Sequence, residues 1–454
     1  MKRASNYRTS IPAVLTATIG ALCGLLPSTS FANDASISRT ANGSTITLTA
    51  SGNRFAGSIS SLTYRGVEYI DIADHGRQMQ SAIQLDGLGE CYNPNEAGSR
   101  ADGKKLTSQS SLQYISSVSN LLETRTRPAF WLAPGQAYEG ACNPNLAPPR
   151  NTISTAQNTT VLSDFIVQRI SSFFGSSIPN VIDVDVQWTI PEAFNSSNTE
   201  ASTAYLPASF GTVLTYDRAT RKLTKVTATA VDSSSQHTAL PVILAQSNGL
   251  HAMGAWSPAI MTNPSRGYMA YLNFSAAVDP TMKWSCVFGE RNIAAGSTYS
   301  YSCPIAVGTV DEVINAINAY PVPGQTLGNM VPVYRFHKAP KHFMTRSYSE
   351  GASEGFTFET TGFRLFPSNA VGRRALYRCH NVASSDHFIS KNSNCEGQND
   401  EGIIGYAATA QSSGLYPLYR FYRADIANHL ITVNYSEGSQ GGYTYESILG
   451  YVAR

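Results

Sequence analysis

A pattern that occurs three times near the C-terminal end constrains this chain more than any other feature. A Tyr-Arg pair recurs at spacings of 43 and 42 residues. Each pair is followed, in the same order, by a histidine before an apolar residue, a Glu-Gly pair and a glycine before an aromatic residue. The markers are Tyr334-Arg335, His342-Phe343, Glu350-Gly351 and Gly362-Phe363 in the first unit, Tyr377-Arg378, His387-Phe388, Glu396-Gly397 and Gly405-Tyr406 in the second, and Tyr419-Arg420, His429-Leu430, Glu437-Gly438 and Gly450-Tyr451 in the third. Four markers in a fixed order indicate three copies of one structural unit.

Three units of this length predict a closed β architecture for residues 331–454. A propeller uses blades of similar length but needs at least four of them, and a solenoid needs distinct capping units. A β-trefoil has three four-stranded units around a pseudo-threefold axis and fits best. Short alternating runs such as 356–360 suit its strands.

The markers also resemble a known family. The pattern Tyr-Arg-x-Tyr, Asp-His-Phe-x-Thr, Glu-Gly and Gly-Tyr is similar to a repeat family of unknown function at the ends of secreted bacterial and fungal proteins. Only the third unit keeps the full first motif, which ends at Tyr422, and only the second carries Asp386 before its histidine; Lys341 and Asn428 stand at that position in the other units. The resemblance implies a β-trefoil-like, carbohydrate-binding module.

The repeated histidines and their neighbours have two interpretations. Equivalent residues in each unit can build a threefold core, because identical packing problems have identical solutions. Alternatively, aromatic rings beside amide, carboxylate or imidazole groups can hold a sugar, since the rings contact its C–H face and the polar groups bind its hydroxyls. The candidate ligand-binding residues are His342, Asp386, His387, Asn428 and His429.

The N-terminal end predicts export. Lys2, Arg3 and Arg8 precede an apolar run over 11–26, and small residues stand before a cleavage point after Ala32. Residues 1–32 are therefore predicted to be a signal peptide, with an uncleaved membrane anchor as the alternative. Cysteine usage agrees, because six cysteines remain after residue 32 and an even number in an exported chain indicates disulfides. The simplest pairing joins neighbours along the chain: Cys91 with Cys142, Cys286 with Cys303, and Cys379 with Cys395.

Composition excludes some partners and bounds the number of domains. Only 14% of the 454 residues are charged and the formal net charge is +2, so nothing indicates a nucleic acid or an anionic membrane as partner. A mature chain of about 420 residues exceeds what one core organises, which predicts two domains. The segment 321–330, after a predicted helix that begins at Asp311, is the expected linker.

Residues 33–320 are predicted to form a large antiparallel β-sandwich, so the whole chain is expected to be all-β. Alternating runs such as 45–49, 58–64 and 181–190 predict strands with one face exposed to water. The run Phe55–Asp71 resembles the start of galactose-mutarotase-like super-sandwich domains, which occur in sugar epimerases, polysaccharide lyases and glycosidases. That resemblance implies a carbohydrate-related role, but its catalytic residues do not map onto this chain.

The densest polar cluster of this region lies between residues 71 and 96. His75 is a candidate for proton exchange, Arg77 for neutralising a substrate carboxylate, and Glu90 or Glu96 for the partner carboxylate. Asp74 and Tyr92 are candidate ligand-binding residues beside them. The alternative is a hydrogen-bonded loop held by the Cys91 disulfide.

Two further candidates for ligand binding are tryptophans. Trp131 and Trp256, the latter preceded by His251, are candidate sugar-stacking platforms, although a tryptophan buried in a sandwich core is the alternative. The chain has no zincin motif, no P-loop, no dinucleotide fingerprint and no calcium loop, and Cys-x-x-Cys is absent, so the sequence predicts no metal and no cofactor.

These patterns lead to one functional hypothesis and two alternatives. The hypothesis is a secreted or periplasmic carbohydrate-active protein, whose sandwich binds or processes a glycan and whose repeat domain binds carbohydrate. If it is an enzyme, the sequence predicts a polysaccharide lyase, glycoside hydrolase or sugar epimerase. The alternatives are a lectin or adhesin that only binds, and a structural protein without a glycan ligand.

Overall fold

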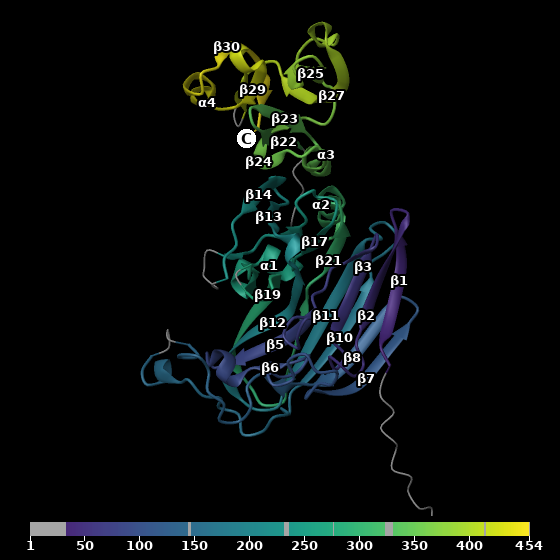
Figure 1. Ribbon diagram of the computed structural model, residues 1–454, viewed down its shortest axis with the longest axis vertical. Helices are drawn as coiled ribbons and strands as arrows, with labels where there is room; N and C mark the ends of the chain where they lie inside the picture. The colour runs from purple at the N-terminus through teal and green to yellow at the C-terminus, as the bar shows by residue number, and fades with distance from the viewer. Residues whose placement is uncertain are drawn as a thin grey trace, which may run out of the picture.

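The computed structural model describes residues 33–143, 147–230, 236–275, 277–322, 330–412 and 415–453. The predicted signal peptide (1–32) and most of the predicted linker lie outside the described residues. The described chain is mostly β, in antiparallel sheets, as the sequence predicts (Figure 1). Within these residues, no helix is both long enough and apolar enough to span a membrane.

Two large sheets and one small sheet form the region before residue 320. The ten-stranded sheet contains β7 (Ser111–Val118), β8 (Leu121–Arg127), β10 (Ile166–Phe173), β11 (Val181–Ile190), β13 (Thr212–Asp217), β14 (Lys222–Val226), β16 (Val242–Ala245), β17 (Ala252–Ala255), β20 (Ser297–Ser302) and β21 (Ile305–Gly308). The seven-stranded sheet contains β5 (Gln80–Leu85), β6 (Pro94–Asn95), β9 (Ala129–Phe130), β12 (Phe194–Pro207), β15 (His237–Thr238), β18 (Gly267–Asn273) and β19 (Thr281–Ile293). A four-stranded sheet of β1 (Ala35–Ala41), β2 (Ser44–Ala50), β3 (Ile59–Tyr64) and β4 (Val67–Glu68) lies beside them (Figure 1).

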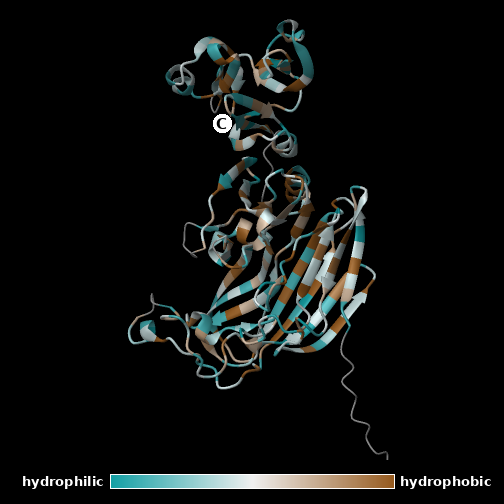
Figure 2. Ribbon diagram, in the orientation of Figure 1, coloured by the Kyte–Doolittle hydropathy of each residue, from teal (hydrophilic) through white to brown (hydrophobic). Residues whose placement is uncertain are grey.

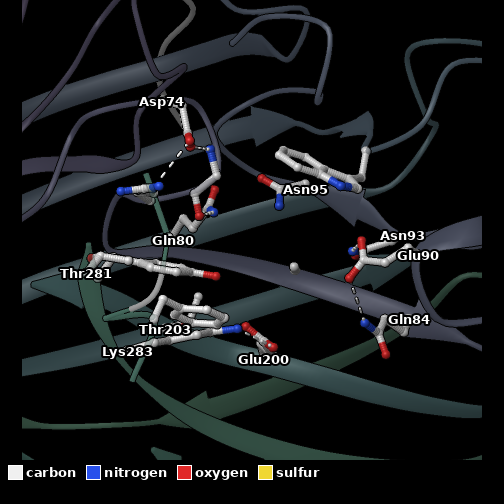
Figure 3. A pocket seen from close by; sticks show the side chains of 17 residues that line it. Asp74, Gln80, Gln84, Glu90, Asn93, Asn95, Glu200, Thr203, Thr281 and Lys283 are labelled. Atoms are coloured by element: carbon white, nitrogen blue, oxygen red, sulfur yellow. Dashed lines mark hydrogen bonds and ion pairs between the residues drawn. The ribbon is translucent and has the colours of Figure 1, made fainter. Parts of the chain in front are cut away.

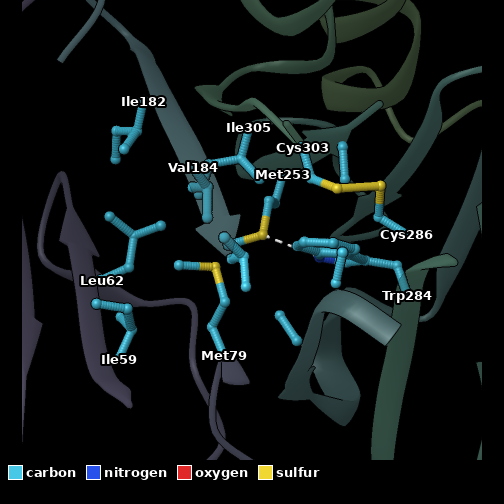
Figure 4. Close-up of a cluster of buried hydrophobic side chains, with 14 of the residues drawn as sticks. Ile59, Leu62, Met79, Ile182, Val184, Met253, Trp284, Cys286, Cys303 and Ile305 are labelled. Atoms are coloured by element: carbon cyan, nitrogen blue, oxygen red, sulfur yellow. Dashed lines mark hydrogen bonds between the residues drawn. A yellow bond between two sulfur atoms is a disulfide. The ribbon is translucent and has the colours of Figure 1, made fainter. Parts of the chain in front are cut away.

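Alternation along the strands builds the core between these sheets. In β11, Ile182, Val184, Val186 and Trp188 are buried, whereas the residues between them are partly or fully exposed, as the sequence predicts. Figure 2 shows the same alternation of hydrophobic and hydrophilic bands along many of the strands. The core also contains Trp284, whose indole N–H donates to the Met253 sulfur at 3.2 Å (Figure 4).

Three disulfides connect parts of the fold. The cysteines pair as Cys91–Cys142, Cys286–Cys303 and Cys379–Cys395, the pairing of neighbours that the sequence favours. The second bond joins β19 to the residue that follows β20, and therefore joins the two large sheets (Figure 4). Three disulfides indicate an oxidising compartment.

The helices are short, and the predicted one is α2 (Val310–Ala319). Its N-cap is Thr309, which forms a capping box with Glu312, so the helix begins one residue before the predicted start at Asp311. Asp311 accepts hydrogen bonds from Ser347 and Tyr348 at the start of α3. The other helices are α1 (Pro258–Thr262), α3 (Tyr348–Ser353), α4 (Tyr435–Gln440) and the 3₁₀ turns η1 (Gly89–Tyr92), η2 (Arg150–Thr152), η3 (Ala208–Phe210), η5 (Pro264–Arg266), η6 (Cys395–Gly397) and η7 (Ala424–Ile426).

Each C-terminal repeat contains three strands and a helical turn, where the expected trefoil unit has four strands. The units are β22 (Val331–Lys338), β23 (Lys341–Thr345) and β24 (Thr357–Leu365); β25 (Arg373–Asn381), β26 (Asp386–Ser390) and β27 (Asn399–Ala408); and β28 (Tyr416–Arg423), β29 (Asn428–Thr432) and β30 (Thr444–Val452). The second and third units share a six-stranded sheet through β27 and β30. The aromatic side chains of the first unit pack on α2 and the ten-stranded sheet in one buried cluster, so the repeat region is anchored to the sandwich.

Candidate functional site

A cavity of about 280 Å³ lies on the face of the seven-stranded sheet that points away from the core (Figure 3). Its floor comes from alternate residues of β5, β6, β12 and β19, whose other faces supply the core. Loops before β5, around η1 and before β19 form its walls. The lining residues are Asp74, Gly76, Arg77, Gln80, Ala82, Gln84, Glu90, Asn93, Asn95, Trp131, Glu200, Thr203, Tyr205, Phe274, Ala277, Thr281 and Lys283.

A β-bulge shapes the floor. Glu200 and Thr203 both line the cavity although they are three residues apart, a spacing that puts side chains of a regular strand on opposite faces. The register of β12 against β19 shifts between Glu200 and Ser202, and this extra residue turns Thr203 back to the cavity side. The bulge therefore places two polar side chains on one surface.

Glu90 is the carboxyl group whose environment favours the neutral form. Its carboxylate accepts hydrogen bonds from Asn93 Nδ2 at 2.9 Å and Gln84 Nε2 at 3.4 Å (Figure 3). Burial raises the pKa of Glu90, and the nearby Glu200 carboxylate raises it further against the lowering effect of the Asn93 hydrogen bond. A carboxyl group whose pKa is raised in this way is better suited to donate a proton.

Lys283 and Glu200 form the ion pair of the floor. Lys283 Nζ lies 2.9 Å from Glu200 Oε1 and 5.3 Å from the centre of the Tyr205 ring. Burial alone would lower the pKa of Lys283, but the Glu200 carboxylate and the Tyr205 hydroxyl raise it above its ordinary value. Burial also raises the pKa of Tyr205, so the lysine is held charged and the phenol neutral.

Arg77 is occupied by acidic groups. Its guanidinium contacts Asp71 Oδ2 at 3.1 Å and Asp74 Oδ2 at 3.3 Å, and donates to the Asp279 carbonyl oxygen at 2.8 Å. Burial lowers the pKa of Arg77, but these carboxylates outweigh that effect and raise it. Arg77 therefore ties together two loops at the cavity rim, and its charge is already matched by protein carboxylates.

The structure brings Asp74, Arg77, Glu90 and Trp131 together in the cavity but places two other predicted catalytic residues outside its lining. Both ring nitrogens of His75 lie 2.7 Å from backbone carbonyl oxygens, those of Gly103 and Arg54. Glu96 is 1% exposed and pairs with Arg169 at 2.6 Å between the two large sheets. Each side chain is thus committed to a buried internal contact.

The remaining candidates of the sandwich also lie apart from this cavity. Tyr92 lines a separate cavity together with Phe130 and Phe194. His251 Nδ1 lies 3.3 Å from the Tyr69 hydroxyl, and Trp256 is fully buried against Tyr320. Trp256 therefore has the core position that was the alternative for it.

Glu200, Tyr205 and Lys283 were not singled out from the sequence. Glu200 is the one charged residue of β12, and six uncharged residues separate Lys283 from the next charged residue of β19, Glu290. A lone charge in such a strand needs a partner on the neighbouring strand, and this was the available signal. That signal predicts an ion pair between the two strands, but it does not predict that the pair lines a cavity.

In the repeat region the structure joins two of the predicted ligand residues in a second cavity, of about 230 Å³. Asp386 Oδ2 lies 2.5 Å from His429 Nδ1, and the His429 ring stacks on Phe388 with the ring centres 4.6 Å apart. Asn428 Nδ2 lies 3.2 Å from His342 Nδ1 in the next interface. His387 instead lies beside His380 and Glu401.

The N-terminal part distantly resembles carbohydrate-related folds in solved structures. Heparan sulfate lyase HepC from Pedobacter heparinus is 8% identical with a TM-score of 0.31, and the match covers 62% of this chain but only 36% of that one. A galactose mutarotase related enzyme from Lactobacillus acidophilus is 8% identical with a TM-score of 0.34, covering 62% of this chain and 99% of that one. The α-galactosidase from Lactobacillus brevis is 10% identical with a TM-score of 0.33, covering 62% and 40%. Similarities this weak carry no argument about function.

A comparison with curated proteins finds no match. The family comparison matches residues 332–453 with a domain of unknown function, DUF5648. The matched range contains all twelve markers of the threefold repeat. The C-terminal region of this chain is thus similar to the DUF5648 domain family.

Proposed function

We propose that this chain is an exported carbohydrate-active protein whose sandwich binds a neutral glycan in the cavity over β5, β12 and β19. The single observation that carries the proposal is the composition of the cavity wall. Aromatic rings of Trp131, Tyr205 and Phe274 share it with amide and hydroxyl side chains. Rings that take the C–H face of a sugar, beside groups that bind its hydroxyls, make up the usual carbohydrate site.

The charges favour a neutral ligand over an anionic one. Arg77 already contacts two aspartate side chains, and Lys283 already pairs with Glu200. No positive charge among the described lining residues is left to receive a uronate or sulfate group. A polysaccharide lyase has to neutralise a uronate carboxylate, so the cavity supports this reaction class less than binding or hydrolysis of a neutral glycan.

Glu90 gives the cavity its capacity for chemistry. Its raised pKa suits a general acid that protonates a glycosidic oxygen, and Glu200 is the second carboxylate that a glycoside hydrolase needs. The Lys283 ion pair holds Glu200 in place. The second candidate function is binding without catalysis, which is favoured by the same ion pair because it already engages one oxygen of Glu200.

The repeat domain is proposed to be a carbohydrate-binding, trefoil-like module. The Asp386–His429 pair, with Tyr422 and Phe388, lines a cavity that has both a ring surface and hydrogen-bonding groups. This domain would hold the sandwich to a glycan surface. Its residues are independent of the first cavity, so the two binding activities can be separated by mutation.

The test is a binding and hydrolysis screen of the full chain against neutral and acidic polysaccharides. Trp131→Ala should weaken binding of a neutral glycan at the sandwich, whereas Tyr114→Ala, which removes an exposed ring from β7, should not. Glu90→Gln should abolish release of reducing ends while binding persists. Tyr422→Ala should weaken binding at the repeat domain, with Tyr445→Ala as its exposed control. Binding of acidic polymers alone, unaffected by Trp131→Ala, would refute the proposal.

A further inference from the structure

The second repeat unit brings three metal-ligating side chains together. His380 on β25 and His387 on β26 are directly opposite each other in the antiparallel register, and Glu401 lies on the adjacent β27. One ligand atom from each residue lies within 4.8 Å of the other two. We propose that these residues bind a Zn²⁺ ion, because two imidazoles and one carboxylate with an open fourth position form an established zinc ligand set.

The cluster can be reached by an ion and is held by its surroundings. The His387 and Glu401 side chains are 19% and 27% exposed. Arg378 donates to Glu401 Oε2 at 2.9 Å, which fixes the carboxylate and leaves Oε1 facing His387 Nε2 at 3.5 Å. The Cys379–Cys395 disulfide anchors the strand beside His380. A carboxylate oriented by a second hydrogen bond is typical of metal ligands.

His387 differs from its two counterparts in what its ring contacts. His429 Nδ1 lies 2.5 Å from Asp386, and His342 Nδ1 lies 3.2 Å from Asn428, each across an interface between units. The residue at the corresponding position for His387 is Lys341, whose ammonium instead donates to two carbonyl oxygens of the third unit, at 2.7 and 2.8 Å. His387 Nδ1 is consequently buried without a hydrogen-bond partner.

The His387 ring is therefore held by no hydrogen bond across the interface between units, although it packs against the Phe343 ring with centres 4.8 Å apart. The His380 and His387 rings stack with centres 4.0 Å apart and planes at 9°. Zinc–ligand bonds of about 2.0–2.2 Å in a tetrahedral site put ligand atoms about 3.3 Å apart. The ligand atoms would therefore approach by about 1.5 Å or less, and the rings would splay so that their lone pairs converge on the ion.

The other two units lack this arrangement. Tyr422 replaces the first histidine in the third unit, where it packs against His429 with ring centres 4.7 Å apart. In the first unit the His337 and His342 rings are 5.0 Å apart at 38°, and the described residues form no three-ligand cluster there. The sequence predicted no metal because these ligands follow no short motif and converge only through strand pairing.

The experiment is equilibrium dialysis of the untagged full chain against Zn²⁺ at pH 7.5, with metal content measured by mass spectrometry. The expected result is one Zn²⁺ per chain. His380→Tyr, which places the third unit's residue in the second, should weaken zinc binding at least 100-fold. Loss of a residue that only hydrogen-bonds to a metal ligand typically weakens binding by about 10–100-fold. Glu401→Gln should weaken it in the same direction, in case the tyrosine variant does not fold.

The matched control is His337→Tyr, the same change at the equivalent position of the first unit, which should bind zinc like the unaltered protein. X-ray absorption of the zinc-loaded chain should show nitrogen and oxygen neighbours without sulfur. Absence of bound zinc, or equal binding by His380→Tyr and the unaltered protein, would overturn the proposal.

Discussion

Replacing Glu96 by glutamine should destabilise the sandwich by about 3–5 kcal/mol. Both oxygens of Glu96 face Arg169, with Oε2 2.6 Å from Nη2 and Oε1 3.3 Å from Nε, and both side chains are 1% exposed. The variant keeps the volume of the side chain and an acceptor for the Ser81 N–H, so no large cavity forms. What it removes is the charge, which leaves the Arg169 guanidinium buried without a counter-ion.

The loss is measurable by urea unfolding followed by tryptophan fluorescence, because Trp188 and Trp284 are fully buried in this core. A domain is typically stable by only about 5–15 kcal/mol, so the midpoint should fall strongly while the slope stays the same. A comparable change in an exposed pair, Glu139→Gln beside Arg100, should cost at most about 1 kcal/mol.

A double replacement separates the charge effect from simple damage. Glu96→Leu combined with Arg169→Met should recover most of the lost stability, because a well-packed apolar pair can substitute for a buried ion pair. An unchanged midpoint for Glu96→Gln would contradict the reasoning. If that variant kept its stability but lost glycan processing, Glu96 would have the catalytic role that the sequence suggested for it.

Three further predictions concern other parts of the chain. Burial lowers the pKa of His342 to about 4, below its ordinary value near 6.5, so the stability gained by keeping this imidazole neutral is fully present above pH 6.5 and is lost as the pH falls toward 4. The thermal unfolding temperature should therefore fall between pH 7 and pH 4.5, and it should fall less steeply in His342→Gln. Gly351→Ala should cost about 1–3 kcal/mol, because the new methyl group would lie 2.5 Å from the Phe336 ring; thermal unfolding measures it. Removing the Cys286–Cys303 bond by a double alanine replacement should cost about 3 kcal/mol for a loop of 17 residues, measured by urea unfolding.

The repeat could be recognised from the sequence because its marker arginines and glutamates form equivalent ion pairs in each unit. Arg335, Arg378 and Arg420 each pair with a glutamate of their own unit and with the glutamate of the Glu-Gly marker in another unit. The cross-unit pairs Arg378–Glu350, Arg420–Glu396 and Arg335–Glu437 close a ring through all three units. Residues with such a fixed geometric role must recur at a fixed spacing, and a structural role therefore accounts for the arginine and the glutamate of these markers.

The cavity of the sandwich could be predicted only in part, for a physical reason. Part of its wall comes from a polar segment that is continuous in the chain, so the cluster from Asp74 to Asn95 was visible in the sequence. Its floor also comes from β12 and β19, whose Glu200 and Lys283 are 83 residues apart in the chain and meet only through strand pairing. The bulge after Glu200 also breaks the period of two, so alternation alone assigns Thr203 to the wrong face.

The positions that vary among the three units are where their chemistry differs. At the position before the marker histidine, Asp386 contacts the histidine of the third unit, and Asn428 contacts that of the first. Lys341 turns away and leaves His387 without such a partner. The arginine–glutamate pairs fix the arrangement of all three units. One substitution can therefore change what one unit binds without altering the fold of the others. A carboxylate–histidine pair suited to sugar hydroxyls and a histidine cluster suited to a metal ion can thus occupy equivalent places in one domain.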